Sequence, residues 1–435
     1  MPDETSRSAV MPSTSPAEAY ATDLERLGRA TPFGGSDDAW LVLAHALHRF
    51  SLLTEDEANA ALSQTADAIA INAVAAGLAT QSSLLRCAMA LQAIHDPSRV
   101  LESGHSPVTE LFVATQAVAE EQELAGAFEL AHATLHGVLR AFGNRATPRA
   151  QGNVMAQLGR VARQLGAHDL AHGYYDEAMM VGYDGEALDV VARALLGLGS
   201  MSLTRGNYPK ARELFERALV NAERSNDPEF VRLAHHGLFN CAFASGDLDS
   251  AMVHGWNVLR LCIAPDSRAD ALVNMAEVCR LTGEHDAAMR VYAVAMEWSS
   301  QPRIRAHAIS GALLSAVATQ RSGDARRYLT ELDRLIPSVA DPYTIAAVTM
   351  ESSHAMHFLG DAAGATARLE MAMSLASSHS FHELSHRMEQ AMSSRRDSTC
   401  TELRLAPQVR RTRHRRSDEY RMVLRSLNGL ASATL

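Results

Sequence analysis

The sequence predicts an all-α protein whose helices come in repeated antiparallel pairs stacked into an α-solenoid, and three observations predict it. Alanine occupies 74 of the 435 positions, whereas aromatic residues make up only 5% of the chain, which favours closely packed helices over β-sheets. Glycines recur at intervals of 37 to 40 residues through the middle of the chain. A small residue stands five positions after nearly every one of these glycines, as closely crossing helices require.

The first hundred residues divide into two segments. Residues 1–36 are rich in Ser, Pro, Thr and Gly, a composition that predicts disorder. Residues 37–105 are expected to be helical, as a degenerate repeat or an N-terminal cap. Within them, AVAAGLATQSSLLR (residues 73–86) has the spacing of a DNA-binding helix-turn-helix, but Ser83 stands where the second helix needs an apolar anchor. An ordinary helical hairpin is the favoured interpretation of this stretch.

Residues 106–395 are predicted to form the repeat array, closed by a capping helix. Glycine at each turn supplies the left-handed backbone that ends a helix. One hairpin cannot bury its apolar face alone, so the hairpins stack. The predicted turn glycines are Gly126, Gly166, Gly206, Gly246, Gly283, Gly323 and Gly360. The residues five positions later are Ala131, Ala171, Ala211, Ala251, Ala288, Tyr328 and Ala365, and larger residues such as Tyr175, Phe215 and Tyr292 are expected to fill the space toward the next hairpin.

This pattern resembles the tetratricopeptide repeat family over residues 106–376, most closely over residues 150–296. The matching residues are the Leu-Gly pairs Leu158-Gly159 and Leu198-Gly199, and the small–aromatic–small sets Ala171/Tyr175/Ala178 and Ala211/Phe215/Ala218. The resemblance implies a right-handed α-solenoid of about seven stacked helix-turn-helix hairpins. It also implies a concave groove, lined by the first helix of each hairpin, that binds peptides or protein surfaces.

Counting back from the turn glycines selects polar residues that are expected to face this groove. Asn240 stands six positions before its glycine, where family members that clamp a peptide backbone or a C-terminal carboxylate often place Asn. A cluster of arginines favours an acidic peptide, although solvated arginines with no dedicated ligand are an open alternative. The candidate partner-binding residues are Asn153, Arg160, Arg163, Arg193, His236, Asn240 and Arg280.

The stretch His382-Glu383-Leu384-Ser385-His386 matches the H-E-x-x-H signature of zinc proteases. Arg387 follows directly, where such motifs take an uncharged residue, and no recognisable second motif supplies a third ligand. The repeat register instead places these residues at the start of the capping helix. Because the sequence also lacks phosphate-binding loops, nucleophile elbows and dinucleotide-binding glycines, we expect no enzyme activity, no metal and no cofactor.

Residues 396–435 form an Arg-rich tail. From Leu403 on, the chain has eight Arg and only two acidic residues, Asp418 and Glu419, which gives this segment a charge of +6. Because the net charge of the whole chain is −10, the other 402 residues carry −16. The run VRRTRHRR (residues 409–416) has the charge to contact phosphate backbone or an acidic partner, but a solvated tail is the favoured interpretation. Residues 419–430 have the pattern of a short amphipathic helix.

The remaining features concern location and role. The five cysteines are scattered and contain no C-x-x-C, which is typical of a reducing cytosol. The longest apolar run, residues 68–79, is too short to span a bilayer, so we expect a cytoplasmic protein, and the Ala- and Arg-rich usage indicates a bacterial source. The leading hypothesis is a non-enzymatic scaffold or adaptor that binds a protein or peptide in its groove. The alternative is a regulatory sensor with nucleic-acid contact through the Arg-rich tail.

Overall fold

The computed structural model describes residues 36–50, 52–53, 61–62, 65–70, 83–396 and 416–434, and every regular element in these ranges is a helix. The chain divides into two compact units, Met1–Met201 and Ser202–Leu435, each taken by itself below. The segment expected to be disordered, residues 1–36, lies outside the described residues except for Ser36. Most of the helix-turn-helix candidate at residues 73–86 also lies outside them.

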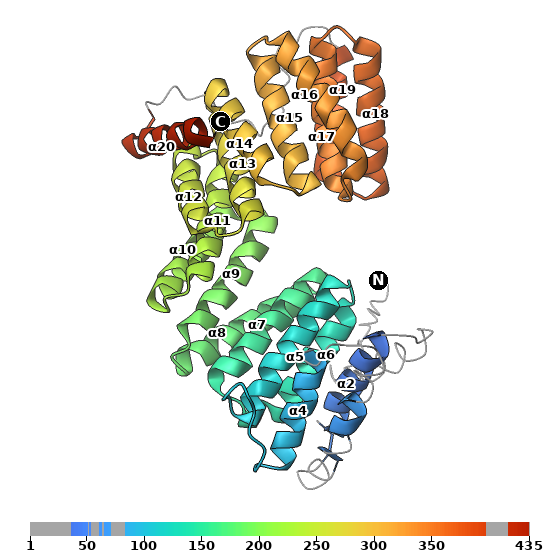
Figure 1. Ribbon diagram of the computed structural model, residues 1–435, viewed down its shortest axis with the longest axis vertical. Coiled ribbons are helices and arrows are strands. Elements are labelled where there is room, and N and C mark those ends of the chain that lie inside the picture. The colour runs from blue at the N-terminus through green and yellow to red at the C-terminus, as the bar shows by residue number, and fades with distance from the viewer. Residues whose placement is uncertain are drawn as a thin grey trace, which may run out of the picture. The chain divides into compact units, whose positions relative to one another are not determined.

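Within the described residues of the first unit, α2 and α4 precede two hairpins and most of α9 follows them (Figure 1). α5 pairs with α6 and α7 pairs with α8, while α4 packs on α5 and α2 packs on α6. Residues 37–105 therefore contribute helices that cover the first hairpin. The elements are α2 (Ser36–Phe50), α4 (Ser83–His95), α5 (Pro107–Leu124), α6 (Phe128–Phe142), a 3-10 turn (Gly143–Arg145), α7 (Pro148–Gln164), α8 (His168–Asp184) and α9 (Leu188–Thr204), whose last residues fall in the second unit.

The second unit continues the alternation of first and second helices. Here α11 pairs with α12, α13 with α14, α15 with α16 and α17 with α18, and each pair packs on the next. The elements are α10 (Tyr208–Arg224), α11 (Pro228–Ser245), α12 (Leu248–Leu261), α13 (Pro265–Leu281), α14 (His285–Trp298), α15 (Pro302–Ala318), α16 (Ser322–Leu335), a 3-10 turn (Ile336–Ser338), α17 (Pro342–Phe358), α18 (Ala362–Ser378), α19 (His382–Arg396) and α20 (Asp418–Thr434).

Most first helices begin in the same way, with proline in the first turn. Proline is suited to this position because its fixed φ matches the helix and its missing N–H would have no partner there. A capping side chain often precedes it: the Asp227 carboxylate accepts hydrogen bonds from the N–H groups of Glu229 and Phe230, and that of Asp341 accepts one from Thr344. The sequence thus marks where most hairpins start.

The turns confirm six of the seven predicted glycines and correct the seventh. Gly126, Gly166, Gly206, Gly246, Gly283 and Gly360 have φ between 74° and 89°. In the sixth hairpin the left-handed residue is Gln320, with φ 57°, while Gly323 lies inside α16. The prediction of a turn at Gly323 was therefore wrong by three residues. Counted from Gln320, the residue five positions later is Ala325 rather than Tyr328.

With that correction, the small position is alanine in every hairpin. All seven alanines are completely buried: Ala131, Ala171, Ala211, Ala251, Ala288, Ala325 and Ala365. The prediction for the large residues is also confirmed. Tyr175 lies against Gly197, Phe215 against Gly237 and Tyr292 against Gly311, each glycine belonging to the first helix of the next hairpin. An aromatic ring from one hairpin thus fits onto a helix that has no side chain at that point.

The C-terminal elements differ in how they meet the array. α19 packs on α17 and α18 through the buried side chains of Leu384, Met388 and Ala391, as expected of a capping helix. α20 covers the residues expected to form an amphipathic helix, but it packs on α12 and α14. The amphipathic helix expected at residues 419–430 is therefore confirmed, and its apolar stripe joins the core of the second unit.

Candidate functional site

The predicted partner-binding residues all lie on first helices and all are half-buried. Because they fall in both units, they form two separate sets. The first unit carries Asn153, Arg160 and Arg163 on α7 and Arg193 on α9, and the second carries His236 and Asn240 on α11 and Arg280 on α13.

In the first unit, the arginine cluster is partly neutralised by acidic residues of α5. Arg160 lies 2.9 Å from a carboxylate oxygen of Glu123 and 3.7 Å from one of Glu120. Arg163 interacts with the phenol of Tyr175. Burial raises the pKa of Tyr175, although the interaction with Arg163 opposes this increase. The charge of Arg160 is therefore satisfied within the unit.

In the second unit, Arg280 is likewise bound to its own helix. Its guanidinium forms a two-pronged ion pair with Glu277, with Nε 2.7 Å from Oε2, and the hydroxyl of Tyr292 donates to the same oxygen at 2.9 Å. Burial opposes the charged form of Arg280, but the Glu277 carboxylate raises its pKa despite that. Arg280 therefore belongs to an internal network.

Three neutral polar side chains of the second unit have no such commitment. The ring of His236 and the carboxamides of Asn240 and Asn274 form no hydrogen bond within the described part of the chain, and all three are half-buried. Burial lowers the pKa of His236, although Asp270 opposes this shift, so its imidazole is neutral at pH 7. His236 and Asn240 are one helical turn apart and so share a face of α11.

A pocket of about 300 Å³ lies between α11, α13 and α15, and His236 and Asn274 are among its lining residues. Its apolar lining comes from Leu233, Val258, Ala271 and Ile304. Its polar lining comes from Arg232, His236, Asp266, Ser267, Asp270, Asn274, Gln301 and Arg303. The pocket therefore combines an apolar lining with uncommitted hydrogen-bonding groups, as ligand sites usually do.

The charged groups around this pocket are paired with one another. Arg232 Nε lies 2.8 Å from Glu229, and Arg303 lies 3.2 Å from Asp270. The Asp266 carboxylate accepts a hydrogen bond from the hydroxyl of Ser299 at 2.7 Å. Because each charge has a partner, the groups left to hydrogen-bond a ligand are neutral ones.

Another hollow, of about 460 Å³, lies at the end of α4 in the first unit. Its lining is exposed or half-buried, and its polar groups already bond to neighbours, with Arg99 2.6 Å from Gln92 and Asp96 2.6 Å from Ser98. It offers no apolar lining and no uncommitted group comparable to those of the pocket between α11 and α13.

Sequence reasoning found His236 and Asn240 but missed Asn274, although a signal was present. Asn274 stands nine positions before its turn glycine. At the same position of three other first helices stand Gly197, Gly237 and Gly311, against which an aromatic ring packs. In the hairpin before Asn274, Gly255 replaces that aromatic residue. At this one place, glycine stands where other hairpins have the aromatic ring, and Asn274 stands where other first helices have the glycine. The packing of a ring against a glycine therefore does not apply here.

The H-E-x-x-H stretch opens α19. His382 and His386 are exposed, and His386 lies 2.8 Å from the amide of Gln390. Among the described residues, no group of three or more His, Cys, Asp or Glu side chains is arranged to hold a metal ion. Within the same ranges, no helix is both long enough and apolar enough to cross a membrane.

Comparisons with known proteins identify the fold. No family model and no curated protein matches the chain. Its structure is similar to that of aspartyl phosphate phosphatase F from Bacillus subtilis, with a TM-score of 0.50 and 10% identity over 79% of this chain and 95% of that one. It also matches RapI (TM-score 0.49, 9% identity, 78% of this chain and 99% of that one) and BtubC from P. vanneervenii (0.43, 19%, 50% and 88%). At such identities the likeness concerns the fold alone. It agrees with the repeated hairpins in giving an all-α solenoid whose hairpins are similar to tetratricopeptide repeats.

Proposed function

We propose that this chain is a non-enzymatic scaffold that binds a peptide segment of a partner protein at the pocket between α11, α13 and α15. The proposal rests on one observation: two neutral, uncommitted polar side chains, His236 and Asn274, line a pocket that also has an apolar lining. Asn240 lies one turn from His236 on the same face of α11. A half-buried polar group that has no internal partner is available to a ligand without breaking any existing bond.

The chemistry of these groups suits an extended peptide. A carboxamide both donates and accepts, so Asn240 and Asn274 match the alternating N–H and C=O groups of a peptide backbone. The apolar part of the pocket lining is suited to one apolar side chain of that peptide; it comes from Leu233, Val258, Ala271 and Ile304. Because Arg232 and Arg303 are paired with carboxylates, recognition here depends on the main chain and one apolar anchor rather than on charge.

The preference for acidic partners belongs to the first unit. Arg160 is neutralised by Glu123, and Arg163 and Arg193 are the other arginines of the predicted cluster. We therefore propose it as a separate contact, tested separately. The nucleic-acid alternative has no supporting observation, because residues 401–415 lie outside the described residues and Arg416 is paired with Asp249.

The test compares partner capture by the full chain and by a His236→Ala/Asn274→Ala variant, followed by anisotropy with tiled peptides of each captured protein. We expect at least one peptide to bind wild type and to lose tenfold or more in affinity in the variant. His168→Ala/Asn144→Ala, at exposed positions of the first unit, is the matched control. A partner that binds wild type and pocket variant equally would refute the site.

The acidic preference is tested with the charge-reversed variant Arg163→Glu/Arg193→Glu. Loss of an acidic partner from this variant alone, with the pocket variant unaffected, would support a contact on the first unit. An unchanged set of partners would remove the arginine cluster from consideration while leaving the pocket proposal intact.

A further inference from the structure

The C-terminal helix α20 lies against α12 and α14, the second helices of the fourth and fifth hairpins (Figure 1). In a repeat array each hairpin normally contacts only its neighbours in sequence. α20 instead returns past two hairpins and α19 to reach this surface. Its buried residues are spaced by three, four and four positions: Tyr420, Val423, Leu427 and Ala431. They form one face of the helix, while Met422 on the opposite face is 60% exposed.

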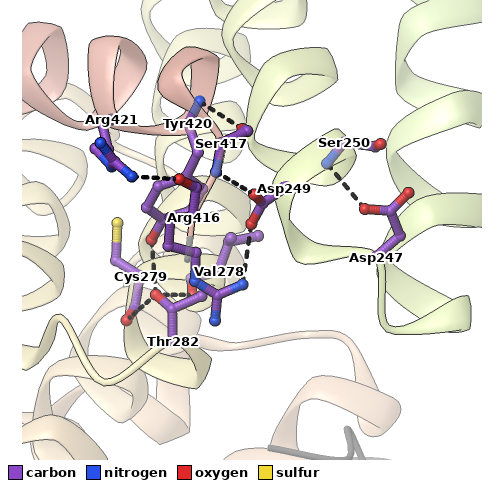
Figure 2. A network of polar contacts seen from close by, with 10 residues as sticks. All are labelled: Asp247, Asp249, Ser250, Val278, Cys279, Thr282, Arg416, Ser417, Tyr420 and Arg421. Atoms are coloured by element: carbon purple, nitrogen blue, oxygen red, sulfur yellow. Dashed lines mark hydrogen bonds and ion pairs between the residues drawn. The ribbon is translucent and has the colours of Figure 1, made fainter. Parts of the chain in front are cut away.

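Polar contacts fix the N-terminal end of α20 in place, as Figure 2 shows. The Asp249 carboxylate receives Arg416 Nη1 at 2.9 Å on one oxygen and the Ser417 N–H at 2.7 Å on the other. The hydroxyls of Tyr420 and Thr282 are 2.7 Å apart. These bonds set both the position and the direction of the helix on the surface.

A further contact near the other end sets the register. Arg290 of α14 donates to the side-chain oxygen of Asn428 at 2.8 Å. The surface of α12 and α14 thus binds the apolar stripe of α20 and forms polar contacts near both ends of the helix.

We propose that the surface of α12 and α14 covered by α20 is a binding site for amphipathic helices, and that α20 is an internal ligand displaced by a helix of a partner protein. The partner helix carries an aromatic residue, then Val, Leu and Ala-sized residues, at the spacing of Tyr420, Val423, Leu427 and Ala431. A basic residue precedes its N-terminus, in the place of Arg416.

The hairpins keep their own bonds when α20 leaves, which makes displacement feasible. The Thr282 hydroxyl also lies 2.9 Å from the carbonyl oxygens of Val278 and Cys279, so it retains partners. Asp249 lies in the first turn of α12, where a carboxylate is favoured by the helix dipole without α20. Thr282 thus keeps its bonds within α13, and Asp249 exchanges its bonds to Arg416 and Ser417 for water or for a new occupant.

The experiment uses the full chain and a fluorescent synthetic peptide of residues 413–435 as the probe helix. A Tyr420→Asp/Leu427→Asp variant removes the internal competitor. We expect this opened chain to bind the peptide at least tenfold more tightly than wild type. Asp249→Lys added to the opened chain is expected to weaken binding at least tenfold, and Glu297→Lys, an exposed change on α14, to leave it unchanged. Absence of binding to the opened chain, or indifference to Asp249→Lys, would overturn the proposal.

A measurement on wild type guards against misfolding of the opened variant. Hydrogen exchange should show the amides of α20 exchanging at least tenfold faster than those of α12 and α14, because a displaceable helix opens by itself. Equal rates would make α20 an integral part of the core and refute displacement. Self-association of wild type at high concentration, abolished by Tyr420→Asp/Leu427→Asp, would assign the site to a second copy of this chain and overturn the partner assignment.

Discussion

The turn of the sixth hairpin provides a test of the repeat register by two substitutions, Gln320→Gly and Gly323→Ala. Gln320 has the left-handed conformation that glycine has in the six other turns, and Gly323 lies within α16. The structure therefore predicts that both substitutions stabilise the protein. A turn at Gly323 would predict the reverse for both, because Ala would then be forced into left-handed backbone and Gly would replace a helical Gln.

The magnitudes follow from backbone energetics. A left-handed conformation costs a residue other than glycine about 1–2 kcal/mol. Glycine at position 320 removes this strain but gains about 0.4–1 kcal/mol of freedom in the unfolded chain. The net gain in unfolding free energy is about 0.5–1 kcal/mol. At position 323, an added Cβ meets nothing within 4 Å, so alanine gains about 0.5–1 kcal/mol from helix propensity alone.

The assay is urea unfolding combined with hydrogen exchange. Repeat arrays do not always unfold in one step, so the urea midpoint can average over several hairpins. Hydrogen exchange of the amides of α15 and α16 instead reports the local free energy of opening at this hairpin. Gly360→Ala, at a confirmed left-handed glycine, should lose about 1 kcal/mol and calibrates the scale. Destabilisation by both Gln320→Gly and Gly323→Ala would refute the structural register.

Two further predictions concern packing and pH. Gly311→Ala should lower the free energy of unfolding by about 1–3 kcal/mol, because the new Cβ would overlap the Tyr292 ring. Gly173→Ala, in open space on α8, is the control and should not lower the free energy of unfolding. Urea unfolding midpoints of the two variants test this prediction. Burial, together with the neighbouring His136, lowers the pKa of His132 to about 3. Its unfolded pKa of about 6.5 is higher, so the unfolded state binds the proton first and stability falls with pH below that value, by about 2 kcal/mol at pH 5. Comparing urea midpoints at pH 7 and pH 5 tests this, and His132→Gln should flatten the dependence; an unchanged slope would assign it to other groups.

The hairpins were predictable from sequence because their packing rule acts on residue size at fixed positions. Ala171 and Ala211 must be small wherever two helices cross closely, and the requirement recurs in each hairpin. The register error at Gly323 arose because a left-handed position prefers glycine without requiring it. Gln320 has the left-handed conformation although it is not glycine. The glycine pattern therefore selected Gly323, which lies three residues later inside α16. Requiring alanine five positions after the turn, which selects Ala325, would have located it.

The site was harder to predict because pairing depends on the next hairpin. Periodicity places Arg160 on the first-helix face, but its neutralisation by Glu123 involves a residue 37 positions earlier. Arg303 finds Asp270 at a separation of 33. Whether a basic residue is available thus depends on the register between hairpins, which composition does not reveal. The docking of α20 is a stronger case, since Arg416 meets Asp249 across 167 positions.

Asn274 allows the functional interpretation of the pocket to be separated from a structural one. Polar residues replace the packing glycine in two other first helices, as Gln157 and Glu351, and both are bonded internally: Gln157 to Gln116 and Glu351 to Ser310. Asn274 forms no such bond within the described residues. Asn274→Ala therefore removes no internal hydrogen bond and replaces a weak helix former by the best one.

We expect Asn274→Ala to raise the free energy of unfolding by about 0.5 kcal/mol while weakening peptide binding at least tenfold. Urea unfolding and anisotropy on the same preparation give both numbers. Gln157→Ala is the contrast, because loss of its bonds to α5 should lower stability by about 1 kcal/mol. Loss of stability in Asn274→Ala would instead show that the carboxamide supports the fold. A residue that binding needs and folding does not is the pattern that a ligand site produces, because selection for the ligand then opposes selection for stability at one position.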